Sequence, residues 1–144
     1  MSRRILVPLD DSEPAFDAFT FALSEFPDAT ITVLHVIDPS EFAGAGGIEG
    51  GAMINYDQIL SAQEGRAEEL IERAETEAAT QDVTIESHVA TGRVDRQIVD
   101  FAADHDVDQI VIGSHGRSGA SRILLGSVAE RVVRRASVPV TVVR

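Results

Sequence analysis

The sequence predicts an α/β three-layer sandwich built on a five-stranded parallel sheet, and two observations carry this prediction. Segments rich in β-formers alternate with segments of helical period, which is the pattern of parallel strands joined by helical crossovers. The strand segments are apolar almost throughout, as in ILV, QIVI and VTVV, which suits strands buried on both faces. At 144 residues the chain has the length of one domain, and we expect a single domain over residues 1–144.

Five strands and four helices are expected along the chain. The strands are predicted over residues 3–9, 30–37, 83–90, 109–113 and 138–143, and the helices over residues 11–26, 56–80, 94–105 and 127–136. Ser12 is the expected N-cap of the first helix, and Pro14 is tolerated in its first turn. Residues 38–55 carry five glycines between positions 44 and 51, which predicts a long mobile loop.

The composition indicates an acidic protein without thiol chemistry. Twenty-four acidic residues face twelve basic ones, all of them arginine, for a net charge of −12. Such an acid excess suggests a salt-rich cytoplasm, as in a halophile, or else biased codon composition with an acidic surface. The absence of cysteine excludes disulfides and thiolate metal sites. No apolar run could span a membrane and no signal-peptide pattern is present, so we expect a cytoplasmic protein.

The charge is unevenly distributed along the chain. Residues 1–108 carry 23 acids and six arginines, a balance of −17. Residues 109–144 carry one acid, Glu130, and six arginines, a balance of +5. A protein this acidic is a poor partner for nucleic acid or an anionic membrane, and we expect neither. The C-terminal quarter is the electropositive part of the chain.

The expected topology places two of the loops together. In open parallel sheets, ligands bind beyond the carboxyl ends of the strands, where the strand order reverses. The commonest order for five such strands, 3-2-1-4-5, puts that point between the first and fourth strands. The segments that meet there are VPLDDS, which contains Asp10, and GSHGRSG. A Rossmann glycine motif is excluded because the first strand-to-helix turn lacks glycine, and a Walker A loop is excluded because the chain lacks lysine.

The stretch GSHGRSGASRILLGS, residues 113–127, has the features of an anion-binding loop. It holds four glycines, which let backbone N–H groups approach an anion closely. Arg117 and Arg122 add positive charge, and no acid occurs between Asp108 and Glu130. The stretch ends at the start of a predicted helix, where unpaired N–H groups and the helix dipole favour phosphate.

These residues also match a known pattern, G-x2-G-x9-G-[ST], through Gly113, Gly116, Gly126 and Ser127. Together with ILVPLDDS at the start and VLHVID at 33–38, the chain resembles the ATP-binding branch of the universal stress protein family over essentially its whole length. The resemblance implies a flavodoxin-like fold, a stress-response role and ATP as ligand. We expect the ATP to carry Mg²⁺ or Mn²⁺, because magnesium is held mostly by phosphates.

The resemblance also implies roles for individual residues. Asp10 would take a ribose hydroxyl, Val36 would offer backbone contacts to adenine, and the two glycine segments would wrap ribose and phosphates. The implied nucleotide-binding residues are Pro8, Leu9, Asp10, Val36, Ile112, Gly113, Ser114, His115, Gly116, Arg117, Ser118, Gly119, Gly126, Ser127, Val128 and Ala129. A homodimer is expected through the apolar C-terminal edge strand, residues 139–143, because an uncovered edge exposes unpaired backbone.

Several residues have structural alternatives. Asp10 could simply end the first strand. SVAE reads as a capping box, with Ser127 as N-cap and Glu130 at N3. His115 is expected to serve backbone hydrogen bonding rather than catalysis, and His35 to lie near the core or the site wall. No general base with a partner is evident, so we expect a binding module rather than an enzyme. The alternatives are a slow ATP hydrolase and a nucleotide-free dimeric scaffold or chaperone-like protein.

Overall fold

The computed structural model describes residues 2–41, 52–115 and 125–144. Its five strands form one sheet in the order β3-β2-β1-β4-β5, and every neighbouring pair is parallel. The strands are β1 (Arg4–Pro8), β2 (Thr30–Ile37), β3 (Ile85–Thr91), β4 (Gln109–Gly113) and β5 (Val140–Val143). The predicted three-layer α/β sandwich with the order 3-2-1-4-5 is confirmed.

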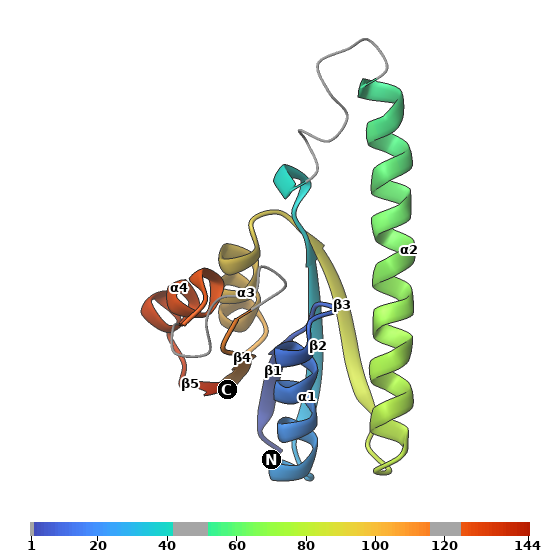
Figure 1. The fold of residues 1–144 in the computed structure, drawn as a ribbon. Coiled ribbons are helices and arrows are strands. Elements are labelled where there is room, and N and C mark those ends of the chain that lie inside the picture. The colour runs from blue at the N-terminus through green and yellow to red at the C-terminus, as the bar shows by residue number, and fades with distance from the viewer. Residues whose placement is uncertain (1, 42–51, 116–124) are drawn as a thin grey trace.

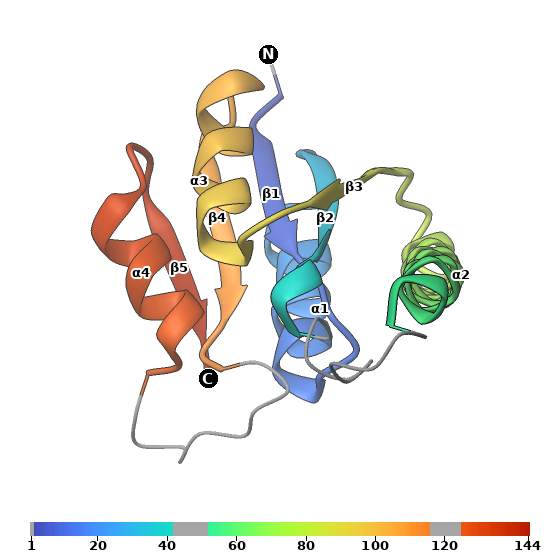
Figure 2. The same cartoon turned by 90° about the horizontal axis from the view of Figure 1, so that it is seen from above.

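Helices cover both faces of this sheet (Figures 1 and 2). The helices are α1 (Glu13–Glu25), α2 (Ala52–Ala79), α3 (Val94–Asp104) and α4 (Ser127–Arg135), with a short 3-10 helix, η1 (Pro39–Glu41), after β2. α1 and α2 pack on one face, and α3 and α4 on the other. The N-terminal part of α2 extends past the sheet (Figure 1). None of these helices, within the described residues, is long and apolar enough to cross a membrane.

The alternation of side chains along the strands divides the core into two clusters. In β1, Val7 packs toward α1 and α2, whereas Leu6 packs toward α3 and α4. The largest side chain buried on the α1 and α2 side is Phe19, which is fully buried. Because β1, β2 and β4 are covered on both faces, their carboxyl ends are held rigidly at one edge of the sheet.

Beyond shifts of one or two residues at helix ends, the helices differ from the predictions in two respects. Residues 38–55 were predicted as one loop, but residues 39–41 form η1 and α2 begins at Ala52; residues 42–51 lie outside the described residues. The capping box predicted for α4 is wrong. Gly126 is the N-cap, without a side-chain hydrogen bond, and Glu130 instead pairs with Arg134 at 3.0 Å. The predicted cap of α1 is confirmed, because the Ser12 side chain accepts from the Ala15 N–H at 3.3 Å.

Candidate functional site

A cavity of about 410 Å³ lies at the carboxyl ends of β1, β2 and β4, where the strand order reverses. Its walls come from the β1–α1 turn, the end of β2, the start of α3, the end of β4 and the start of α4. The lining residues are Pro8, Leu9, Asp10, Ser12, Ala15, Leu34, His35, Val36, Glu41, Val94, Ile98, Ile112, Gly113, His115, Gly126, Ser127, Val128 and Ala129. Its position is the one that the topology favours for a ligand.

The β1–α1 turn holds Asp10 in a defined orientation. Asp10 Oδ1 accepts a hydrogen bond from the Ser12 N–H at 2.8 Å, which closes an Asx turn directly after the strand. The same turn is held from the β2 side, where Leu9 N–H donates to the Leu34 carbonyl at 2.9 Å. One Asp10 oxygen is therefore committed to the turn, and the second can accept from a ligand hydroxyl.

The opposite wall is formed by two backbone segments in close contact. The N–H of Gly126 donates to the Ser114 carbonyl at 2.7 Å, which brings the start of α4 against the end of β4. A Cβ on Gly126 would lie 2.9 Å from His115 Cα, so the approach requires glycine. At Gly113 a Cβ would lie 2.7 Å from the Pro14 carbonyl carbon. Close packing of backbone, rather than positive φ, explains both glycines.

The start of α4 offers hydrogen-bond donors to the cavity. The first N–H groups of an α-helix have no partner within the helix. At α4 the N-cap residue, Gly126, supplies no side-chain hydrogen bond, and the residues that carry these N–H groups, Ser127, Val128 and Ala129, all line the cavity. These donors and the helix dipole favour a negatively charged group at this end of the cavity.

The rest of the cavity is largely apolar. Its apolar wall is contributed by two strands and by the first turns of α3, through Leu34, Val36, Val94, Ile98 and Ile112. The cavity therefore combines an apolar slot, a fixed carboxylate at Asp10 and a set of N–H donors. A ligand that fits all three has an apolar part, a hydroxyl-bearing part and an anionic part.

The charged side chains in the described lining are acidic, apart from the two histidines. Asp10 and Glu41 are the carboxylates. His115 shares a hydrogen bond between its Nδ1 and the Ser114 hydroxyl at 3.1 Å. Arg117 and Arg122, which were expected to contribute positive charge, lie outside the described residues. Among the described residues, no group of histidines and carboxylates is arranged to hold a metal ion.

The structure brings most of the predicted site residues together. Eleven line the cavity: Pro8, Leu9, Asp10, Val36, Ile112, Gly113, His115, Gly126, Ser127, Val128 and Ala129. Ser114 is buried directly behind the wall, and Gly116, Arg117, Ser118 and Gly119 lie outside the described residues.

Sequence reasoning missed the contribution of α3. Val94 and Ile98 stand four residues apart, so they form an apolar stripe on one helix face. That spacing indicates burial, but it does not distinguish a cavity wall from the core. Ser12, Ala15, Leu34 and Glu41 were also missed, whereas His35 was expected at the core or the wall and lies there.

Comparison with known proteins gives a family match over residues 1–144, to the model described as universal stress protein family. A universal stress protein of Methanocaldococcus jannaschii is 34% identical over 99% of this chain and 82% of its own length. The solved structure of a universal stress protein from Lactobacillus plantarum superposes with a TM-score of 0.85, at 28% identity over 99% of this chain and 97% of its own.

Some solved structures of similar fold contain a nucleotide. A universal stress protein from Archaeoglobus fulgidus is described as a complex with dAMP; it has a TM-score of 0.66 and is 23% identical over 100% of this chain and 98% of its own. Others are described as complexes with AMP, from Arabidopsis thaliana, and with cAMP. At these identities the likeness is one of fold.

Proposed function

Because the chain belongs to the universal stress protein family, we propose that the cavity binds an adenine nucleotide, ATP carrying Mg²⁺ or Mn²⁺, and that the protein is a dimeric stress-response binding module. Relatives of the same fold are described with AMP, cAMP and dAMP, which supports an adenine nucleotide as the ligand class. The metal would be carried by the phosphates, because magnesium is usually held by phosphates with few protein ligands.

Each part of the nucleotide has a matching part of the cavity. Adenine fits the apolar slot beside Val36 and Ile98, where the backbone of β2 ends and offers its polar groups. The Asp10 oxygen that does not hold the turn would accept from a ribose hydroxyl. The phosphates would lie at the start of α4. The relative with bound dAMP is consistent with a single hydroxyl contact, since that nucleotide keeps only the 3′-hydroxyl.

The observation that carries the proposal is the uncapped start of α4 at the end of an apolar cavity. Many helix starts have a Ser, Thr, Asp or Asn side chain over their first N–H groups, although Gly is also common at this position. Here the N-cap is Gly126, and within residues 2–41, 52–115 and 125–144 no side chain caps the first N–H groups. What distinguishes the start of α4 is that three consecutive residues of its first turn, Ser127, Val128 and Ala129, line the cavity.

The experiment changes one of those donors without changing the helix. Ser127 is the first helical residue, where proline fits, and Gly126 has the extended conformation that a residue before proline adopts. Ser127→Pro removes the N–H and the hydroxyl, whereas Ser127→Ala removes the hydroxyl alone. Because a hydrogen bond to a charged group contributes about 1.5–3 kcal/mol, Ser127→Pro should weaken ATP binding at least about tenfold by calorimetry.

The matched variant separates the backbone from the side chain. Ser127→Ala should retain most of the affinity if the backbone carries the phosphate contact. Equal affinities of the proline variant and the unmodified protein would reject the phosphate site at α4, provided that circular dichroism shows the same helix content in both.

Analysis of the unmodified protein as purified distinguishes a binding module from an enzyme and from a scaffold. Protein is denatured as purified, and its supernatant is analysed by ion-exchange chromatography. ATP or AMP in that supernatant supports the binding module. Accumulation of ADP from added ATP would indicate a hydrolase. If the supernatant contains no nucleotide and calorimetry detects no binding in molar KCl, the protein is the nucleotide-free scaffold.

The dimer is proposed through β5, which ends the sheet order. All four of its residues, Val140–Val143, are partly buried in the single chain, and the exposed Val133 of α4 is on the neighbouring element. An apolar edge strand of this kind favours pairing with a second copy across a two-fold axis.

A further inference from the structure

The three arginines of α4 differ in what they contact. Arg134 pairs with Glu130 at 3.0 Å, and Arg135 reaches the buried carboxylate of Asp95 at 3.7 Å. Arg131 is exposed, and within the described part of the chain its guanidinium makes no hydrogen bond or ion pair. In a chain with 24 acids and 12 bases, an arginine without an acidic partner calls for an explanation.

The helix dipole does not explain Arg131. A cation is stabilised in the last turn of a helix, where the carbonyl groups without helical partners carry a partial negative charge. The last turn of α4 contains Arg134 and Arg135, whereas Arg131 is the fifth of nine helical residues. The dipole therefore accounts for the last two arginines and leaves Arg131 without a role in α4.

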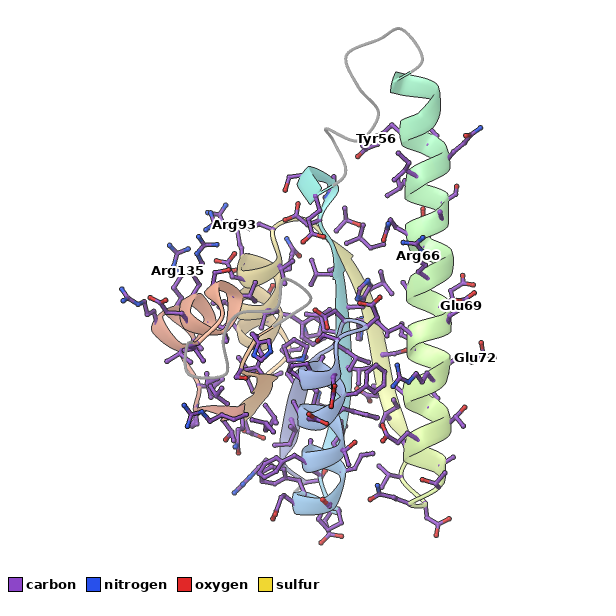
Figure 3. The ribbon with its side chains drawn as sticks, in the orientation of Figure 1. Tyr56, Arg66, Glu69, Glu72, Arg93 and Arg135 are labelled. Atoms are coloured by element: carbon purple, nitrogen blue, oxygen red, sulfur yellow. The ribbon has the colours of Figure 1, made fainter. Side chains whose placement is uncertain are left out.

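Arg131 lies on the flank of α4 that faces α3 and the cavity. At about 100° per residue, Val128, Arg131 and Arg135 fall within about 60° of one another around the helix. Val128 lines the cavity, and Arg135 reaches across to Asp95 of α3. Figure 3 shows Arg135 on the same side of the molecule as Arg93, and both arginines contact Asp95. Arg131 is not a lining residue, but it lies on this flank one turn beyond the cavity wall.

Helix geometry directs the Arg131 side chain back toward the start of α4. Side chains of a helix tilt toward its N-terminus, so a long side chain covers the turn before its own Cα. Ser127, which lines the cavity, is four residues back, or about 6 Å along the helix axis. An extended arginine side chain spans that distance. The Arg131 guanidinium can therefore reach a group that is bound at the first turn and extends past it.

The described lining of the cavity does not by itself balance the charge of a triphosphate. It contains the carboxylates of Asp10 and Glu41, and the N–H groups of α4 offer the partial positive charge of a helix end. A nucleoside monophosphate would place its one phosphate at these N–H groups. A triphosphate adds two phosphates that must lie beyond them, where a fixed cation would offset their charge.

We propose that Arg131 binds the terminal phosphate of the nucleotide and thereby makes the site prefer a triphosphate to a monophosphate. The inference rests on the proposed nucleotide function and adds one residue to that site. A guanidinium suits this role because its paired N–H donors match two phosphate oxygens and it stays charged at neutral pH. AMP, whose phosphate ends at the first turn of α4, gains nothing from Arg131.

The test measures ATP and AMP binding by calorimetry, with protein freed of nucleotide and at fixed concentrations of KCl and Mg²⁺. Arg131→Gln should weaken ATP binding at least about tenfold, because it removes a charge-assisted contact, and should change AMP binding less than about twofold. Because Arg131 is exposed and unpaired, the variant should fold normally, which circular dichroism checks. Unchanged ATP affinity, or equal weakening of ATP and AMP, would overturn the inference.

Arg96→Gln is the matched control, because it removes the same charge from the neighbouring helix. Arg96 is exposed near the start of α3. It is two residues from both Val94 and Ile98, which line the cavity, so it lies on the opposite face of α3. Arg96→Gln should leave the affinities for ATP and AMP unchanged. An equal loss of ATP affinity in both variants would mean that net charge rather than a contact is responsible, and would also overturn the inference.

Failure of the proposed function gives a different result from failure of this inference. If the unmodified protein binds neither ATP nor AMP, the nucleotide function is rejected and the role of Arg131 is rejected with it. If the unmodified protein binds both nucleotides and Arg131→Gln does not change the ratio of their affinities, the nucleotide function stands and only the role of Arg131 is rejected.

Discussion

Gly113 and Gly65 show how different two glycines can be at the scale of single residues. A Cβ on Gly113 would lie 2.7 Å from both the carbonyl carbon and the carbonyl oxygen of Pro14, at the point where β4 passes the start of α1. These are backbone atoms of a packed helix, so they cannot rotate away. A Cβ on Gly65, in the exposed part of α2, would meet nothing within 4 Å.

Opposite effects on stability follow from the same substitution. Gly113→Ala should lower the free energy of unfolding by about 1–3 kcal/mol, because the extra methyl forces β4 and α1 apart. Gly65→Ala should raise it by about 0.5–1 kcal/mol, because alanine loses less conformational entropy in a helix. Urea unfolding of both variants at one salt concentration measures this. A stabilising Gly113→Ala would mean that β4 and α1 are not in close contact.

The candidate site shows at residue scale what a sequence can and cannot specify. Asp10 was predicted because the expected strand order brings the first loop to the fourth, and Gly126 because its spacing matches a known glycine pattern. The close packing of Gly113 against the Pro14 backbone was not predictable, because the two residues are 99 positions apart in the sequence. The prediction of a capping box at α4 was wrong because Glu130 can bond either to the helix start or to Arg134, and it pairs with Arg134. The hydrogen bond from Gly126 N–H to the Ser114 carbonyl decides where the helix begins.

At the scale of elements, α3 and α4 are linked by a buried carboxylate. Asp95, in the first turn of α3, is 1% exposed. Its Oδ1 accepts from Arg93 Nε at 2.8 Å, and its Oδ2 lies 3.7 Å from an Arg135 nitrogen at the end of α4. Arg93 and Arg135 are each about half exposed, and both lie on the side of the molecule that carries α3 and α4 (Figure 3).

Asp95→Asn should lower the free energy of unfolding by about 1–2 kcal/mol. The amide keeps an oxygen for Arg93, but its NH₂ group faces Arg135 where an acceptor is needed. The loss stays moderate because water solvates both arginines. Glu130→Gln removes the partner of Arg134 in an exposed pair and should change stability by less than about 0.5 kcal/mol. Equal effects in chemical denaturation would mean that Asp95 does not hold the two helices together.

Elements buried on both faces were the easiest to predict. β2 and β4 begin and end at the predicted residues, and β1, predicted at 3–9, spans Arg4–Pro8, because their apolar runs stop close to where burial stops. β3 lies at the edge of the sheet and was predicted at 83–90, but it spans Ile85–Thr91. Its ends are set by its partner, since Ile85 pairs with Ile31 and Thr91 with Ile37. That information belongs to β2 and cannot be obtained from the β3 sequence.

At the scale of the whole molecule, the free edge of β5 carries the proposed dimer. The Pro139 and Val143 carbonyls accept from Ile110 and Ser114 of the β4 side, each at 2.9 Å. In a parallel ladder the groups that face one neighbour alternate, so residues 139, 141 and 143 face β4. Val140 and Val142 therefore turn their N–H and C=O groups outward, where a second copy would pair.

Val142→Pro removes one outward N–H and leaves the ladder with β4 intact, since proline is tolerated on an edge strand. It should shift the protein from dimer to monomer by light scattering at fixed protein and salt concentration. Val142→Ala, which loses more side-chain volume but keeps the N–H, should remain dimeric. If the dimer is held by side chains instead, alanine will dissociate it at least as well as proline. Because a net charge of −12 repels two copies, both variants are best compared in high salt, which is also the setting predicted from the acid excess.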